Sequence, residues 1–290
     1  MSRPQEHGTS PSVTPPDIFD RNLRRLRRDR AAPDYPAHDF LRAAMLDGIA
    51  ERLASVTRTF SDTLDLGCFD GSFRPPPGGR TVRSDPGAAF ARMAGGIQHD
   101  EDQPAFPNAS FDLIISAGTL DTVSDLPGAL ALARRALRPD GLFMAAFTGG
   151  ASLSTLRAVL REAEGERPAA RVHPQVDVRS AGDLLMRAGF ALPVADVETL
   201  TVRYRDIWSL FRDLRGMAAT NLLPGTPTLR RDTLARAAQA FAALADSDGR
   251  TNERFDIVFL TGWAPDESQP KPARRGSATS SLAEALKRRD

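Results

Sequence analysis

Hydrophobic residues in the middle of the chain form short, nearly continuous runs, and amphipathic stretches separate some of these runs. Runs at 63–67, 80–84, 111–118 and 142–147 predict strands, and the stretch 126–137 predicts a helix with Pro127 in its first turn. Strands that alternate with helices are typical of βαβ units, in which helices cover both faces of a mainly parallel sheet. The pattern therefore predicts a doubly wound α/β domain.

The pattern after Gly150 is mainly helical. It predicts helices near 151–163, 180–188, 205–217 and 228–245, and strands at 198–204 and 254–263. A strand that follows a helical insertion is expected to join the sheet that is already present. We therefore predict one domain over residues 17–263, with an insertion at about 205–245 before the last strand.

Both ends of the chain are rich in small and polar residues. Residues 1–16 and 264–290 are predicted to be flexible tails, the second ending in a short helix. Between the first tail and a helix predicted at 38–53, the segment 17–32 predicts a short arginine-rich helix. We expect its arginines to form a solvated face that Asp17, Asp20 and Asp29 partly balance, with a docking surface for an acidic partner as the alternative.

The composition excludes several classes of function. The 290 residues include 38 basic and 37 acidic side chains, so no overall field would attract nucleic acid. No apolar run is long enough to cross a bilayer, and no signal peptide is evident, which predicts a cytoplasmic protein, or a membrane-peripheral one through a partner. One cysteine and four scattered histidines predict no disulfide and no metal site.

Acidic residues follow three successive predicted strands. Asp65 stands in a loop with Gly67 and Gly71, Asp85 ends the second strand, and Asp100 follows a short third strand that precedes the run at 111–118. Such a loop lets backbone N–H groups approach a ligand, and a carboxylate after the second strand can accept both hydroxyls of a ribose. The three acids indicate a nucleoside site, and the alternative is that they are ordinary loop acids.

These segments resemble a known family. The runs TLDLGCFDG, DEDQPAFPNASFDLIISAG and SDLPGALALARRALRPDGLFMAAF resemble class I S-adenosylmethionine-dependent methyltransferases. The segments IFDRNLRR, DLRGMAATN, RRDTL and QPKPARRGSATSSLAE resemble, more narrowly, the mitochondrial complex I assembly factor 5 family and its bacterial relatives. This resemblance extends over about residues 17–281.

The resemblance implies a Rossmann-like sheet of seven strands with S-adenosylmethionine as cofactor. By the family pattern, the cofactor-binding residues are Asp65, Gly67, Gly71, Asp85 and Asp100. Members of the family are associated with hydroxylating an arginine of the complex I subunit that carries an iron–sulfur cluster near the quinone site. Broader relatives methylate oxygen, nitrogen or carbon. The implied partner is therefore a protein substrate, a subunit of complex I.

Two departures from the family pattern predict weak cofactor binding, with its loss as the alternative. Phe69 replaces the middle glycine of the loop, where a positive φ would cost about 1–2 kcal/mol. Pro75–Pro77 and two glycines follow in the segment where the family has a helix whose N-terminus faces the cofactor. The fold can survive both changes.

Candidate substrate-side residues lie further along the chain. Asp121 follows the fourth strand, and we interpret it either as an acid that pairs with an incoming guanidinium or as a solvated loop residue. Tyr204 and Trp208 could line a substrate pocket or belong to the core. Cys68 is expected to be a small buried residue. Asp121 and Tyr204 are the candidate catalytic residues.

Three functions remain open at this stage. The first is an S-adenosylmethionine-dependent transferase that modifies or helps assemble a complex I subunit, with a protein arginine as acceptor. The second is a non-catalytic assembly platform with a degenerate cofactor site. The third is O-methylation of a malonyl carrier, as in relatives from biotin synthesis.

Overall fold

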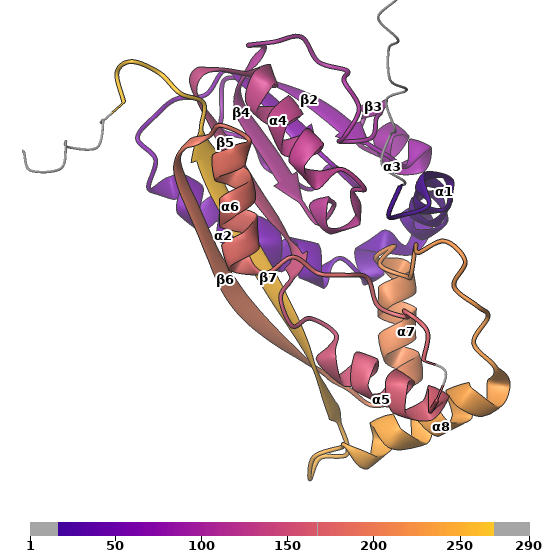
Figure 1. Ribbon diagram of the computed structural model, residues 1–290. Helices are drawn as coiled ribbons and strands as arrows, with labels where there is room; N and C mark the ends of the chain where they lie inside the picture. Colours follow the sequence, from indigo (N-terminus) through magenta and orange to yellow (C-terminus); the bar gives the residue numbers. More distant parts are fainter. Residues whose placement is uncertain (1–16, 167, 270–290) are drawn as a thin grey trace, which may run out of the picture.

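The computed structural model describes residues 17–166 and 168–269. A seven-stranded sheet forms its centre, in the order β3-β2-β1-β4-β5-β7-β6 (Figure 1). The strands are β1 (Asp62–Leu66), β2 (Arg80–Asp85), β3 (Ile97–Gln98), β4 (Phe111–Ala117), β5 (Leu137–Gly149), β6 (Ala191–Tyr204) and β7 (Thr251–Trp263). Strands β1 to β5 pair in parallel, and β7 pairs antiparallel with both β5 and β6. The predicted doubly wound, mainly parallel fold is confirmed.

Helices cover both faces of the sheet. They are α1 (Arg21–Ala31), α2 (Phe40–Ala54), α3 (Ala88–Met93), α4 (Leu126–Ala136), α5 (Ser154–Glu164), α6 (Val178–Arg187), α7 (Ile207–Gly216) and α8 (Arg231–Ala243). Helices α4 and α6 pack on one face, and α2 and α3 pack on the other. Alternate residues of β5 enter the two cores, which explains the continuous apolar run in that strand.

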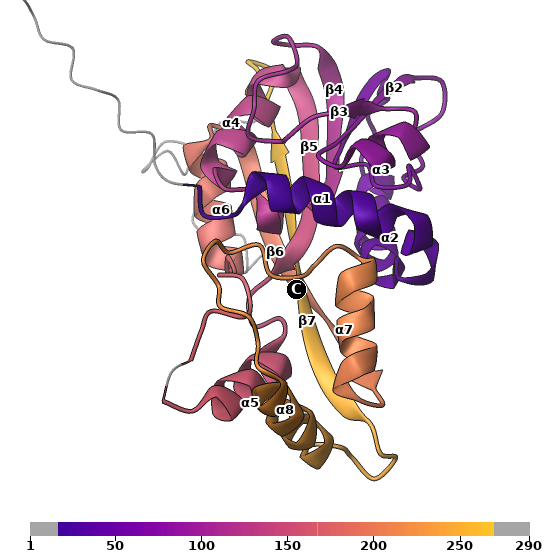
Figure 2. The same cartoon turned by 90° about the vertical axis from the view of Figure 1, so that its right-hand side faces the viewer.

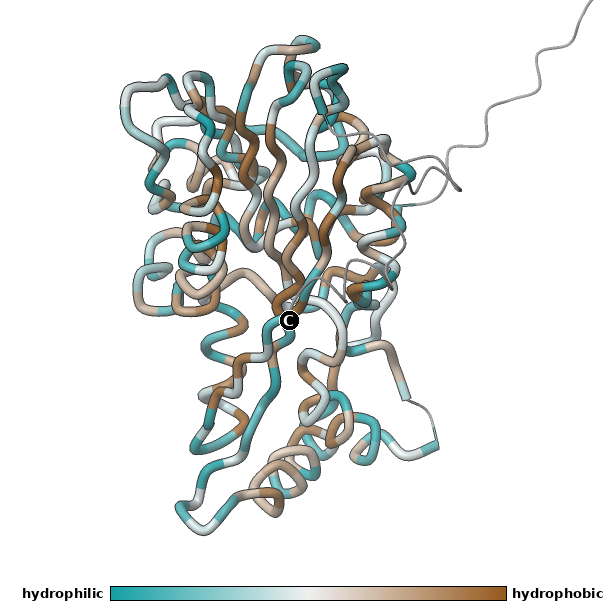
Figure 3. The backbone as a smooth tube through the Cα atoms, turned by 90° about the vertical axis from the view of Figure 1, so that its left-hand side faces the viewer, coloured by the Kyte–Doolittle hydropathy of each residue, from teal (hydrophilic) through white to brown (hydrophobic). Residues whose placement is uncertain are grey.

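The second half of the chain builds an extension beyond the sheet. Strands β6 and β7 run on as a long antiparallel pair, and α5, α7 and α8 pack beside it (Figures 1 and 2). Figure 3 shows hydrophobic residues concentrated in the central strands and hydrophilic residues at the far end of this pair. The predicted final strand therefore does rejoin the sheet after the helical segment. Both strands are longer than the pattern indicated: β7 begins with three polar residues, Thr251–Glu253, and β6 begins at Ala191, with Pro193 near its start.

The segment after β1 contains no helix. Residues 72–79 are neither helix nor strand, as the three prolines predict, and the chain passes directly into β2. A helix appears only after β2, where α3 was not expected from the sequence. The predicted tail at 1–16 and most of the one at 264–290 lie outside the described residues, so the domain division remains a prediction.

Candidate functional site

The three predicted strand-end acids lie at one edge of the sheet. Strand β2 pairs in parallel with both β1 and β3, so Asp65, Asp85 and Asp100 share the carboxyl edge. All three are buried. The three acids that the sequence singled out thus lie at one edge of the sheet. The contacts of each carboxylate determine which ligands this edge can bind.

The loop after β1 has the tight turn that its glycines require. Gly67 has a φ of 81°, and an added Cβ would lie 2.3 Å from the Thr119 side chain. The N–H groups of Gly67 and Cys68 both donate to Ser84 O, which ties this loop to β2. Gly71 has a φ of 76°. Cys68 is fully buried as expected, and burial raises the pKa of its thiol.

The ring of Phe69 points into the site. Phe69 has a φ of 48° and is only 3% exposed. Its ring stacks on Tyr35 at 4.9 Å between centroids and meets Phe90 edge-on at 5.1 Å. Its N–H donates to Asp85 Oδ2 at 2.9 Å. Packing against Tyr35 and Phe90 thus stabilises a backbone conformation that is unfavourable by itself.

Arg28 of α1 pairs with Asp85, the acid predicted to bind the ribose. Its Nε and Nη2 atoms donate to the two carboxylate oxygens of Asp85, at 2.8 and 2.5 Å. The guanidinium lies 3.9 Å from the centroid of the Phe69 ring, and both charged side chains are almost fully buried. A carboxylate in this bidentate pair has no oxygen left in position for a ribose diol.

The third strand-end acid, Asp100, is also paired with α1. Asp100 contacts Arg25, with Arg21 Nη1 at 3.6 Å and Arg24 Nη1 at 3.8 Å. The two acids that follow Asp100 in the chain are also paired with arginines of α1. Glu101 accepts two hydrogen bonds from Arg24, at 2.7 and 3.0 Å, and Asp102 accepts two from Arg21, at 2.5 and 3.0 Å.

The expectation of a solvated arginine face on the first helix is therefore wrong. Arg24 and Arg28 are buried, and the partners of the α1 arginines come from the strand ends rather than from Asp17, Asp20 and Asp29 alone. A signal was present in the sequence. Residues 21, 24, 25 and 28 follow the spacing of one helix face, which is the spacing of a face that packs against something.

Asp65 differs from the other two acids. Its nearest cation is Arg42 of α2, whose Nη2 lies 3.7 Å from Oδ1, and neither carboxylate oxygen accepts a hydrogen bond from the described residues. Burial raises the pKa of Asp65 to about 6. The same Arg42 also lies 3.5 Å from Asp70 Oδ1, so its guanidinium is shared between two carboxylates.

Little space remains where an S-adenosylmethionine would lie. The cavity between α1, α2 and the Phe69 loop has a volume of about 40 Å³, with Arg28, Tyr35, Arg42 and Phe69 in its wall. That volume holds a few water molecules and no nucleoside. In this conformation the residues present do not fit the cofactor, because a guanidinium and a phenyl ring fill the site.

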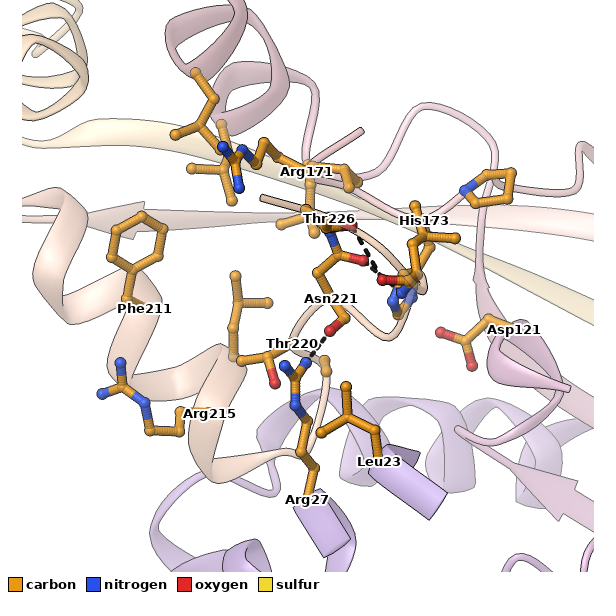
Figure 4. Close-up of a pocket in the computed structure, with 18 of the residues that line it drawn as sticks. Leu23, Arg27, Asp121, Arg171, His173, Phe211, Arg215, Thr220, Asn221 and Thr226 are labelled. Carbon is orange, nitrogen blue, oxygen red and sulfur yellow. Dashed lines mark hydrogen bonds between the residues drawn. The ribbon is translucent and has the colours of Figure 1, made fainter. Parts of the chain in front are cut away.

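A much larger pocket adjoins the small cavity and shares Leu41, Asp121 and Thr148 with it. It has a volume of about 510 Å³ and opens between the sheet, α5, α7 and the loop at 219–229 (Figure 4). Its walls are largely apolar, with Leu156, Phe211, Leu214 and Phe255 among them. This size and lining are typical of sites for small molecules or for inserted side chains.

Asp121 lines both the small cavity and the large pocket. It lies in the single turn of 3-10 helix Leu120–Thr122 after β4, and in the close-up its carboxyl group faces the pocket (Figure 4). Its Oδ1 atom is shielded from solvent and has no hydrogen-bond partner among the described residues. Burial raises the pKa of Asp121 to about 7.

Cationic side chains line the same pocket. Arg27 of α1 donates to Asn221 O, and Arg171 pairs with Glu164 at 2.6 Å, while Arg215 of α7 also lines the wall. His173 accepts from the Leu222 N–H at 2.8 Å, and burial lowers its pKa to about 4, so the ring is neutral at pH 7. The pocket therefore combines an apolar body with one buried carboxyl group and several guanidinium groups.

The second candidate catalytic residue lies elsewhere. Tyr204 at the end of β6 is buried in the core, and it lines a separate hollow with Asp213 rather than the pocket at Asp121. Trp208 is 51% exposed. The structure thus separates Tyr204 from Asp121, which leaves Asp121 as the substrate-side candidate.

Two further observations concern metals and membranes. Within residues 17–166 and 168–269, no group of three or more His, Cys, Asp or Glu side chains is placed to hold a metal ion. No helix in this part of the chain is both long and apolar enough to span a membrane.

Comparison with known proteins gives first a class and then a family. A family model described as a methyltransferase domain matches residues 37–193. The YcgJ protein of Bacillus subtilis has the same fold, with a TM-score of 0.52 and 15% identity over 76% of this chain and 97% of that one. The chain therefore carries a domain of the S-adenosylmethionine-dependent methyltransferase type.

The sequence relatives are more specific. "Arginine-hydroxylase NDUFAF5, mitochondrial" of Danio rerio is 33% identical, over 93% of this chain and 90% of the relative. A malonyl-[acyl-carrier protein] O-methyltransferase of Halorhodospira halophila is 35% identical over 54% of each chain. Within the methyltransferase class, the chain belongs to the NDUFAF5 family, which confirms the resemblance drawn from its motifs.

Proposed function

We propose that this protein helps assemble respiratory complex I by binding an arginine-bearing segment of one of its subunits in the pocket at Asp121. The observation that carries the proposal is the half-buried Asp121 carboxyl group, which has a shielded oxygen without a partner among the described residues and faces a pocket of about 510 Å³. The family supports the choice of an arginine, since its relatives are named as arginine hydroxylases.

The charge state of Asp121 suits a cationic ligand. A carboxyl group with a pKa of about 7 is partly protonated at neutral pH, because its burial outweighs the opposing effect of Arg24 and Arg28. An arriving guanidinium would favour the ionised form and could donate two parallel hydrogen bonds to it. The apolar walls would hold the aliphatic part of the side chain and its neighbours.

The occupied nucleoside site favours binding over methyl transfer. Arg28 does not line the large pocket, so a partner can enter that pocket while Arg28 stays on Asp85. We therefore propose that the protein acts as an assembly platform in this conformation. We place it in the cytoplasm, where it would reach the membrane through complex I alone.

Malonyl-carrier methylation is the second candidate. It is supported by the relative that bears this name and by Arg27 and Arg215 in the pocket wall, which suit a carboxylate ligand. It also requires S-adenosylmethionine, for which this conformation has no room. Mass analysis of a malonyl carrier after incubation with the protein and S-adenosylmethionine distinguishes the two: a gain of one methyl group would favour methylation.

The proposal is tested with peptides that tile the complex I subunit carrying the iron–sulfur cluster near the quinone site. One arginine peptide should bind, and its citrulline counterpart should bind about tenfold more weakly or worse, since citrulline lacks the charge. Asp121→Asn should weaken binding of the arginine peptide to a similar degree.

The matched control is Asp47→Asn, because Asp47 is exposed on α2, away from the pocket. This variant should bind the peptide as the unaltered protein does. Equal binding by Asp121→Asn and the unaltered protein would contradict the proposal, as would the absence of binding by every arginine peptide.

A further inference from the structure

Helix α1 presents four guanidinium groups to four carboxylates at the carboxyl edge of the sheet. The guanidinium groups belong to Arg21, Arg24, Arg25 and Arg28, and the carboxylates to Asp85, Asp100, Glu101 and Asp102. We propose that this edge is a guanidinium-binding site for the protein's own first helix, and that α1 and a nucleoside exclude one another there. This inference goes beyond the proposed function and does not depend on it.

The charge balance supports an exclusive site. Each of these carboxylates is at least nine-tenths shielded from water, and each has a guanidinium within hydrogen-bonding distance. A buried carboxylate that loses its cation is costly, and a neutral nucleoside supplies hydroxyl and amine groups but no compensating charge. A nucleoside that displaced α1 would therefore have to compensate for the free energy of the lost ion pairs.

The backbone of α1 is packed too closely to share the edge. An added Cβ at Gly87, just after β2, would lie 2.7 Å from Arg28 Cβ. Asp29 Oδ1 accepts the Ala89 N–H at 2.8 Å, so α1 also satisfies a donor in the first turn of α3. The ribose position and the donor at the start of α3 are thus both taken by residues of one helix.

Helix α1 is also part of the large pocket. Leu23 and Arg27 line that pocket, and the Asp20 N–H donates to Leu222 O in the loop that closes it. The Phe19 N–H donates to Ser124 Oγ, which fixes the start of the helix to the segment after β4. Withdrawal of α1 to admit a nucleoside would therefore also remove one wall of the large pocket.

The test is a titration with S-adenosylhomocysteine, followed by calorimetry, on the full chain. The opened variant combines Arg28→Ala with Phe69→Gly, which removes the guanidinium and the ring and leaves a glycine where φ is positive. Its Kd for S-adenosylhomocysteine should be lower than that of the unaltered protein by about tenfold or more. Arg30→Ala, at an exposed position of α1, should leave the Kd unchanged.

A second variant is available in case the opened one does not fold. Arg25→Gln removes one half-exposed guanidinium from Asp100 and keeps the core intact, and it should lower the Kd in the same direction by a smaller factor. Near-ultraviolet circular dichroism establishes that each variant is folded.

Two results would overturn the inference. One is a folded variant of either kind that gains no affinity for S-adenosylhomocysteine. The other is binding of S-adenosylhomocysteine to the unaltered protein with the same Kd as the opened variant. Neither experiment includes a partner peptide, so their failure would leave the proposed binding of an arginine peptide at Asp121 standing, and failure of the peptide test would leave this inference standing.

Discussion

At the scale of single residues, the pair formed by Arg28 and Asp85 determines what the sheet edge can bind. Both side chains are buried, their contact is bidentate, and the Phe69 N–H adds a third hydrogen bond to the same carboxylate. A pair of this kind contributes less than its Coulomb energy indicates, because both charges have left water, but removing one partner leaves the other charge buried and unpaired.

This asymmetry predicts the outcome of a double-mutant cycle. Arg28→Ala should lower the free energy of unfolding by about 3–5 kcal/mol, and Arg28→Ala combined with Asp85→Asn should recover part of that loss. Chemical denaturation measures each value. Arg30→Ala, which is exposed on the same helix, should change stability by less than about 0.5 kcal/mol. A double variant as unstable as Arg28→Ala alone would show that the two residues do not act as a pair.

Asp121 predicts a dependence of stability on pH. Its pKa is about 7 in the folded protein and near 3.8 in the unfolded chain, so the folded state holds more protons between these values and stability falls as pH rises from 4 to 7. Asp121→Asn removes this dependence. The variant should match the unaltered protein near pH 4 and exceed it by about 1–3 kcal/mol above pH 7. Denaturation at several pH values tests this, and a constant difference would contradict it.

At the scale of helices and strands, N-cap residues and prolines determine where helices begin and end. Asp206 begins α7 with a capping box, in which its side chain accepts the Ser209 N–H at 2.7 Å and Ser209 Oγ interacts with the Asp206 backbone. Asp39 precedes α2 without such a bond. Helix α7 carries Phe211, Leu214 and Arg215 into the large pocket, so its start also positions the pocket wall.

The two aspartates form a matched comparison. Asp206→Ala should cost about 1 kcal/mol in the free energy of unfolding, because N–H groups of the first turn of α7 lose their acceptor. Asp39→Ala should cost less than half of that, since Asp39 caps no N–H group. Thermal or chemical denaturation gives both numbers. Equal losses would mean that the capping box contributes nothing specific.

Much of the secondary structure could be predicted from the sequence. The strand at 111–117 and the helix at 126–136 follow from periodicity, and Pro75–Pro77 exclude a helix after β1. The burial of the α1 arginines could not be derived in the same way. The arginine spacing indicates that one face of α1 carries arginines. The carboxylates that pair with them lie 57 to 81 residues away in the chain, so they can be identified only from the folded structure, which brings the strand ends next to α1. The inward ring of Phe69 likewise depends on Tyr35 and Phe90, which are distant in sequence.

At the scale of the whole molecule, α1 borders both the nucleoside position and the large pocket. Arg28 fills the nucleoside position, while its neighbour Arg27 lines the large pocket and contacts the loop at Asn221. The family's methyltransferase-type sheet is retained, and the edge that would hold a cofactor is neutralised by the chain's own cations. The protein is therefore expected to be stable without a cofactor, because four buried acidic side chains of this edge, Asp85, Asp100, Glu101 and Asp102, are already paired with arginines.

Hydrogen exchange of the full chain, with and without S-adenosylhomocysteine, tests the exclusion most directly. In the unaltered protein, we predict strongly protected amides in α1 (Arg21–Ala31), and any ligand protection at residues 67–71 should come with a loss of protection in α1. Protection of residues 67–71 by the ligand while α1 stays fully protected would show that both occupy the site together, and would contradict the exclusion.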